Sequence, residues 1–270
     1  MRGLIAKTLR ETWLTTVFLA CALCLVKFLL TFVLPQFQKE MGDLLAQLPM
    51  VQAMLSALMG IDVEEEFTAR VLQSLVWVHP VVLAILWTHT IMFCTRVPAG
   101  EISGGTIDFL LSLPVSRRTV YCSESLMWVV SGLLLIVLGV AGHVAGAWVG
   151  SMENRPGPLV VLFVVVNQYG LYLAVGGVTC LFAAMSNRRG RAAAVVVGIV
   201  LGSFLLNFLS QFWQPAERLA FLGLLEYYRP AEIVRSGAFP LGDMIVLMLV
   251  AGAAWVAGGV IMIRRNICTL

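Results

Sequence analysis

The sequence is poor in charged residues. Asp, Glu, Lys and Arg make up 12% of its 270 residues, whereas a typical soluble domain contains about 25%. Hydrophobic residues make up 60%, which is more than one soluble core can bury. The composition therefore excludes an ordinary soluble domain, and it also excludes an intrinsically disordered chain. The mean hydropathy of +0.92 indicates a helical membrane protein with several spans.

Other features are missing as well. No G-x-x-x-x-G-K-[ST] pattern occurs, so the chain has no phosphate loop to bind nucleotide phosphates. The apolar runs are continuous, which disfavours a transmembrane β-barrel with its alternating strands. Residues 1–11 are too polar, and the following apolar run is too long, for a cleavable signal peptide. None of the six cysteines lies in a segment that we place on the outer side, which disfavours extracellular disulfides.

Six apolar runs are long enough to cross a bilayer as helices, which takes about 20 residues. We predict spans at residues 13–34, 71–95, 120–149, 158–185, 192–212 and 243–263. The predicted fold is therefore an all-α polytopic membrane protein, in which residues 1–270 form a single transmembrane domain. The third and fourth spans exceed the bilayer thickness, so they should tilt or protrude.

The lysines and arginines indicate which side faces the cytoplasm. Segments 1–12, 96–119, 186–191 and 264–270 together hold 11 of them, whereas segments 35–70, 150–157 and 213–242 hold six. Because cytoplasmic loops carry an excess of Lys and Arg, both termini and the 96–119 loop should lie in the cytoplasm. The 35–70 and 213–242 segments are then the large extracytoplasmic segments.

Three segments outside the spans show helical patterns. Residues 1–12 should form an amphipathic interfacial helix that leads to Trp13 at the membrane surface, with a disordered tail as the alternative. Residues 41–59 repeat apolar side chains at steps of three and four, which predicts a second amphipathic helix. The segment 213–242 is rich in aromatic and proline residues, and should hold a short helix or a re-entrant piece packed on the outer surface.

The loop at 96–119 contains the most informative stretch. Gly104 and Gly105 break the chain, Thr106 can cap a new helix, and Pro114 ends it. Asp108 lies in the first turn, where the helix dipole favours a negative charge. These residues predict a short helix at the membrane surface that is suited to docking a soluble partner. A surface helix without a partner would show the same pattern. Its apolar face comprises Ile107, Leu110 and Leu111, with Phe109 as a further candidate.

This loop resembles the signature of ABC-2-type permeases, the membrane subunits of type-2 ATP-binding-cassette exporters, in the string Glu101…Gly105-Thr106-Ile107-Asp108-Phe109-Leu110-Leu111-Ser112-Leu113-Pro114-Val115-Ser116-Arg117. The resemblance covers essentially the whole chain. It implies that residues 106–113 form the coupling helix, which sits in a cleft of a separate ATPase. One position departs from the family, because Ile102 stands where a basic residue often follows the glutamate. The residues that the resemblance assigns to coupling are Glu101, Gly105, Thr106, Asp108, Leu110, Leu111, Pro114, Arg117 and Arg118.

The resemblance also implies a function and partners. The chain would be the permease subunit of an ATP-binding-cassette transporter in a bacterial-type cytoplasmic (inner) membrane. It would form an export path with a second permease, as a homodimer or heterodimer. It would not be an enzyme and would hold no cofactor, because ATP and Mg²⁺ bind to the partner ATPase; no nucleic acid is expected. The alternatives are an ATP-independent secondary transporter or channel, and a membrane scaffold that does not transport.

Polar side chains inside the spans are candidates for a substrate path, because their burial in a bilayer is costly. Lys27 could instead snorkel towards the outer headgroups, and the amides could form hydrogen bonds between helices. The three histidines include no i, i+4 pair on one helix, so no metal site is predicted. The substrate-path candidates are Lys27, His79, His89, Asn167, Asn207 and Gln211.

Glycines at intervals of four residues occur in two spans. One set is Gly142, Gly146 and Gly150, and the other is Gly198 and Gly202. Small residues at this spacing let two helix backbones approach closely. Packing within the chain is the expected use, and an interface with a second permease is the alternative.

Overall fold

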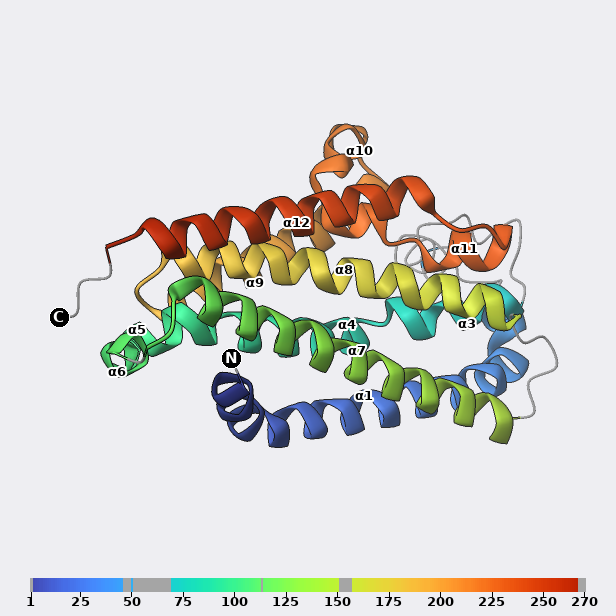
Figure 1. Ribbon diagram of the computed structural model, residues 1–270. Coiled ribbons are helices and arrows are strands. Elements are labelled where there is room, and N and C mark those ends of the chain that lie inside the picture. Colours follow the sequence, from blue (N-terminus) through green and yellow to red (C-terminus); the bar gives the residue numbers. More distant parts are fainter. Residues whose placement is uncertain (1, 46–49, 51–68, 113, 151–156, 267–270) are drawn as a thin grey trace.

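Figure 1 shows a computed structural model of the chain, which describes residues 2–45, 50, 69–112, 114–150 and 157–266. Every element in these ranges is a helix, and the described residues contain six helical stretches long and apolar enough to cross a membrane, one for each predicted span. The predicted all-α polytopic fold is confirmed. The elements are α1 (Arg2–Leu45), α3 (Ala69–Val78), α4 (Pro80–Cys94), η1 (Arg96–Gly100), α5 (Glu101–Ser103), α6 (Ile107–Ser112), α7 (Arg117–Val149), α8 (Pro158–Met185), α9 (Arg189–Ser210), α10 (Gln214–Leu219), η2 (Ala220–Leu222), η3 (Leu224–Tyr227), α11 (Pro230–Ser236) and α12 (Leu241–Arg264).

The first helix is longer than the sequence suggested. We predicted an interfacial helix at 1–12 and a separate span at 13–34, but α1 is one helix of 44 residues. No glycine or proline lies between Gly3 and Pro35 to interrupt it. Its first turns run at an angle to the rest (dark blue in Figure 1). Most of the amphipathic helix predicted at 41–59 lies outside the described residues.

The second span is broken, whereas we predicted one helix over 71–95. It consists of α3 and α4, which meet at His79. Pro80 has no N–H to donate to a preceding turn, so it favours the first position of a new helix. His79 is the residue before that helix, and its Nδ1 accepts a hydrogen bond from the Val81 N–H at 3.3 Å. His79 therefore serves as a helix cap at this break.

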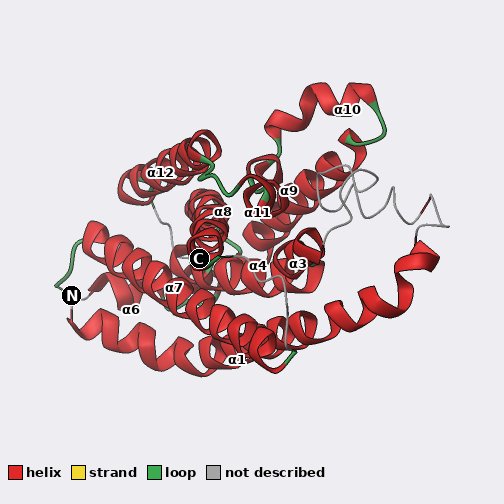
Figure 2. Cartoon of the chain, turned by 90° about the vertical axis from the view of Figure 1, so that its right-hand side faces the viewer, coloured by secondary structure: helices red, strands yellow, loops and turns green. Residues whose placement is uncertain are grey.

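The long helices pack as two close pairs, and Figures 1 and 2 both place α8 between α7 and α12, with α1 beyond α7. Glycines permit the close approach. A Cβ at Gly142 of α7 would lie 2.1 Å from the Cys24 carbonyl oxygen of α1, and one at Gly177 of α8 would lie 2.4 Å from the Ala251 oxygen of α12. Packing within the chain is confirmed for Gly142 and Gly146, whose Cβ would meet the Phe28 oxygen at 2.5 Å.

The glycines of α9 are used differently. A Cβ at Gly198 or Gly202 would meet no atom of the described chain within 4 Å. Among the described residues, these two glycines therefore contact no neighbouring element, and the surface around them is open.

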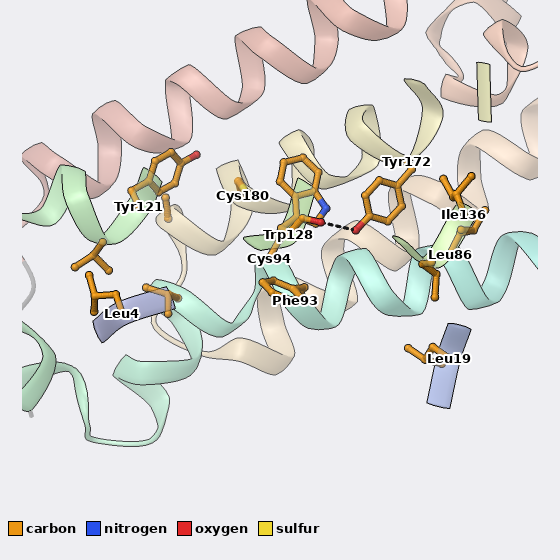
Figure 3. Packing of buried hydrophobic residues seen from close by; sticks show 14 of the residues in the cluster. Leu4, Leu19, Leu86, Phe93, Cys94, Tyr121, Trp128, Ile136, Tyr172 and Cys180 are labelled. Atoms are coloured by element: carbon orange, nitrogen blue, oxygen red, sulfur yellow. Dashed lines mark hydrogen bonds between the residues drawn. The ribbon is translucent and has the colours of Figure 1, made fainter. Parts of the chain in front are cut away.

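An aromatic cluster fills the space between α4, α7 and α8 (Figure 3). The Trp128 and Tyr172 rings stack with centroids 5.9 Å apart, and the Tyr172 hydroxyl donates to the Trp128 carbonyl oxygen at 3.3 Å. The indole N–H of Trp128 donates to Thr90 Oγ1 at 2.9 Å. The Tyr172 hydroxyl and the Trp128 indole N–H thus both have hydrogen-bond partners, as is usual for buried tyrosine and tryptophan side chains.

Arginines bind the carboxyl ends of three spans, all at the end of the bundle that carries α5 and α6 (Figure 1). Arg189 donates to the Met92 oxygen of α4 at 2.7 Å, Arg265 to the Ala184 oxygen of α8 at 2.7 Å, and Arg117 to the Arg265 oxygen just beyond α12 at 2.6 Å. The last carbonyl groups of a helix lack partners within the helix and carry partial negative charge, so a cation is favourable there. These contacts connect neighbouring spans at the end of the bundle where the loop helix lies.

Candidate functional site

The short helix α6 stands between the second and third spans and presents two different faces. It follows Gly105, whose φ of +70° is readily adopted only by glycine. Ile107 and Leu110 are buried, whereas Asp108 and Phe109 are exposed, Phe109 to 78%. The side chain of Leu111 lies outside the described part. Leu110, predicted among the docking residues, thus anchors α6 to the bundle, and Phe109 is the apolar group offered outward.

Glu101 ties this loop to the first helix. Its Oε1 accepts a hydrogen bond from Lys7 Nζ at 2.6 Å, and its Oε2 accepts one from the Thr106 hydroxyl. Burial acts to raise the pKa of Glu101, but the bonds from Lys7 and Thr106 and the charges of Lys7 and Arg96 outweigh it, so the pKa is lowered. The residue after Glu101 is Ile102, so no basic side chain directly follows the glutamate in the loop. The cation that binds Glu101 is Lys7, from α1.

Thr106 occupies the predicted position just before α6, where its carbonyl oxygen accepts from the Leu110 N–H at 3.2 Å. Its hydroxyl binds Glu101, so the expected side-chain cap gives way to a link between α5 and α6. Ser116 caps α7, and its side-chain oxygen accepts a hydrogen bond from the Thr119 N–H at 3.1 Å. Both ends of the loop are therefore held by specific hydrogen bonds.

A second ionic cluster lies beside the first and was missed by the sequence reasoning. Arg96 Nη2 lies 2.5 Å from Glu124 Oε2 on α7, and Nη1 pairs with Glu11 on α1. Thr8 donates to Glu124 Oε1 at 2.6 Å. Glu124 carried a usable signal, because it is an ionisable residue within a predicted span. Its partner Arg96 is 28 residues away in the sequence and was counted only for topology.

The two arginines after α6 have separate environments. Arg117 folds back onto the end of α12, as described above, and so is not presented beside α6. Arg118 is exposed. Among the predicted coupling residues, Glu101 and Thr106 are hydrogen-bonded to each other. Asp108 and Arg118 are exposed. Leu110 and Arg117 instead make contacts within the chain.

A groove of about 790 Å³ lies between α4 and α9. It is almost entirely apolar, with Trp87, Val197 and Phe204 among its walls, and Arg189 and Thr95 lie where α9 begins. None of the six substrate-path candidates lines it. An apolar groove of this size can accommodate an apolar ligand or a neighbouring helix.

The six candidates make other contacts. Lys27 is fully buried and donates to Gln168 at 2.9 Å, so the snorkelling alternative is wrong. Asn167 donates to the Tyr227 carbonyl oxygen at 3.0 Å, and Asn207 to Glu226 at 3.3 Å. His89 contacts Thr16 and Tyr172, His79 caps α4, and Gln211 is exposed at the end of α9. Among the described residues, no three His, Cys, Asp or Glu side chains are grouped to hold a metal.

Comparison with known proteins bears on this arrangement. A family model described as "ABC-2 family transporter protein" matches residues 42–205, which include the loop, α6 and the groove. No curated protein and no solved structure matches the chain.

Proposed function

The chain belongs to the ABC-2 family of transporters, and we propose from this premise that it is the membrane subunit of an ATP-driven exporter whose ATPase is a separate polypeptide. The six helical stretches of the described residues that are long and apolar enough to cross a membrane show that it is a multi-pass membrane protein. The chain has no phosphate loop of its own, so ATP and Mg²⁺ are expected on the partner. The membrane is expected to be a bacterial-type cytoplasmic membrane, with both termini and the α6 loop in the cytoplasm.

The exposed tip of α6 is the observation that carries this proposal. Phe109 is a large apolar side chain exposed to 78% on a loop outside the spans, beside the exposed Asp108. Aromatic side chains that fill a pocket of the partner supply much of the binding energy at protein interfaces. Ile107 and Leu110 hold the same helix against the bundle, so force applied to Phe109 reaches the spans.

The ionic contacts give that force a second route. Glu101 binds Lys7, and Arg96 joins Glu11 and Glu124. These residues belong to α1, to the loop and to α7. A displacement of α6 by the ATPase would therefore move α1 and α7 together with the end of α4.

The face for the second permease is proposed to be α9 with the adjoining groove. Gly198 and Gly202 are open, and the groove between α4 and α9 is apolar along most of its length. Small residues four apart favour close helix pairing in membranes. Two copies, or this chain and a related permease, would enclose a shared path between their grooves.

Co-purification with the ATPase tests the proposal. An ABC ATPase encoded beside the permease should co-purify with the wild-type chain from detergent or nanodiscs. Phe109→Ala should weaken that binding about tenfold or more, without lowering the melting temperature of the permease alone. Phe221→Ala is the matched control, because Phe221 is also exposed, to 60%, but lies in η2. Equal binding by wild type and Phe109→Ala would refute the docking assignment.

A further inference from the structure

Four buried residues form a closed ring of contacts in the interior of the bundle, through their side chains and the carbonyl oxygen of Trp77. Lys27 Nζ donates to Gln168 Oε1 at 2.9 Å and lies 3.7 Å from the centroid of the Trp77 ring. Gln168 Nε2 donates to the Tyr228 hydroxyl oxygen at 3.1 Å, and the Tyr228 hydroxyl donates to the Trp77 carbonyl oxygen at 3.0 Å. Each member thus contacts two others. We call this set the Lys27 ring.

The ring joins elements that are far apart in the sequence. Lys27 belongs to α1, Trp77 to α3, Gln168 to α8, and Tyr228 to the link between η3 and α11. Lys27 and Gln168 are fully inaccessible, Trp77 is 2% exposed and Tyr228 is 5% exposed. The 214–236 segment, which contains α10, η2, η3 and α11, is therefore attached to three spans at one buried point.

The ring is an unusual environment for a lysine. Within the part of the chain that the structure describes, Lys27 forms no ion pair, and its Nζ contacts an amide oxygen and an aromatic face. A charge in this environment is costly to bury, and apolar residues often replace a buried charge without loss of stability. Packing stability alone therefore does not explain a lysine at this position. A positioning role does, because Lys27 donates a hydrogen bond to Gln168 and Gln168 donates one to Tyr228.

The position of Lys27 on α1 adds a mechanical connection. Lys7 and Lys27 both belong to α1, separated by about 30 Å of helix at 1.5 Å per residue. Lys7 binds Glu101 beside α6, so α1 contacts the loop through its angled first turns and the ring farther along. Movement of α1 along its axis would draw Lys27 away from Gln168.

We propose that Lys27 is a positioning residue that latches the 214–236 segment onto the spans, and that displacement of α1 releases this latch. The latch itself depends only on contacts within this chain, whereas its use in transport rests on the proposed function. Asn167, next to Gln168, donates to the Tyr227 carbonyl oxygen at 3.0 Å and holds the same segment from the adjacent position.

Hydrogen exchange of the full chain in nanodiscs tests the latch without any ATPase. Lys27→Met should increase amide exchange in residues 224–236 at least tenfold, while exchange in α12 and the melting temperature stay close to wild type. Lys27→Arg, which keeps a cationic donor, should restore most of the protection. If Lys27→Met fails to fold, Tyr228→Phe makes the same test, because it removes only the hydroxyl that joins Gln168 to Trp77.

Leu23→Ala is the matched control. Leu23 lies one turn before Lys27, is fully buried, and packs on α7 at Gly139, so its truncation removes a buried apolar contact of α1 with α7 and leaves α1 in place and all four ring residues unchanged. It should lower the melting temperature and leave residues 224–236 protected. Unchanged exchange in Lys27→Met and Tyr228→Phe, or an equal increase in Leu23→Ala, would overturn the latch. Phe109→Ala should retain full protection of this segment, so failure of ATPase docking and failure of the latch give different results.

Discussion

The contact between Lys7 and Glu101 joins residues 94 positions apart and sets one end of α1 against the α6 loop. Glu101 is largely buried, whereas the Lys7 side chain is 40% exposed. Solvent screening at the lysine limits what such a pair contributes to folding, typically to about 1 kcal/mol. Its importance lies in position, because it connects α1 to the loop that carries Phe109.

This pair makes stability depend on pH in a defined direction. The pKa of Glu101 is lowered in the folded chain from an ordinary value of 4.5, so folding favours the ionised form. The stabilisation is fully present above the ordinary pKa and is lost as the pH falls through the lowered one. Glu101→Gln should therefore lower the unfolding free energy by about 1 kcal/mol at pH 7, and the difference from wild type should vanish in acid.

Thermal unfolding in nanodiscs at pH 7 and at acid pH would measure this dependence. Asp108→Asn serves as the control, because Asp108 is an exposed carboxylate on the neighbouring helix whose charge, among the described residues, interacts only with the dipole of the short α6, and it should lower the melting temperature at pH 7 less than Glu101→Gln does. A Glu101→Gln variant as stable as wild type at pH 7 would show that the pair does not hold α1 in place.

At the scale of elements, the two sets of glycines have opposite roles. Gly142 is pressed against the α1 backbone, and Gly198 faces open space. Gly142→Ala should therefore destabilise the permease by about 1–3 kcal/mol, the usual cost of overpacking. Gly198→Ala makes the same chemical change on an open surface and should leave the melting temperature of the single chain unchanged.

Thermal unfolding of both variants, with their oligomeric state measured in nanodiscs, would test the two roles. Equal destabilisation by both changes would contradict the assignment of Gly142 to the α1–α7 contact and of Gly198 to an open surface.

The six spans could be predicted because length and hydropathy determine them almost alone. The break at His79 had a visible cause in Pro80, but the long apolar run concealed it. The continuity of α1 was harder to foresee, since charge patterning separated residues 1–12 from the span although no residue breaks the helix between them. The ends of the helices thus depended on the presence or absence of single helix-breaking residues, such as proline, more than on composition.

The candidate site was predicted in part. The loop helix and its start at Thr106 followed from glycine, threonine and proline, whose local preferences act within a few residues. Which side chains of α6 face outward did not follow, because the burial of Leu110 and the exposure of Phe109 depend on where the bundle lies. The pairing of Glu101 with Lys7, and of Arg96 with Glu124, requires tertiary structure that no spacing in the sequence encodes.

At the scale of the whole molecule, the contacts form a connected path. The α6 helix is held by buried Ile107 and by Glu101, Glu101 holds α1, and α1 reaches the 214–236 segment through the Lys27 ring. Arginines fix the ends of α4, α8 and α12 near the same loop. A displacement of the α6 loop can therefore be transmitted through α1 to the 214–236 segment.

Crosslinking in living cells tests the central claim, that a soluble ATPase grips α6. A photoreactive phenylalanine analogue at position 109 should capture a polypeptide that carries a phosphate loop, while the same analogue at the buried position 107 should react only within the permease. We expect that polypeptide to be captured from position 109 alone. Reaction of position 109 with lipid only, or its labelling by a reagent confined to the outside of the cell, would contradict it.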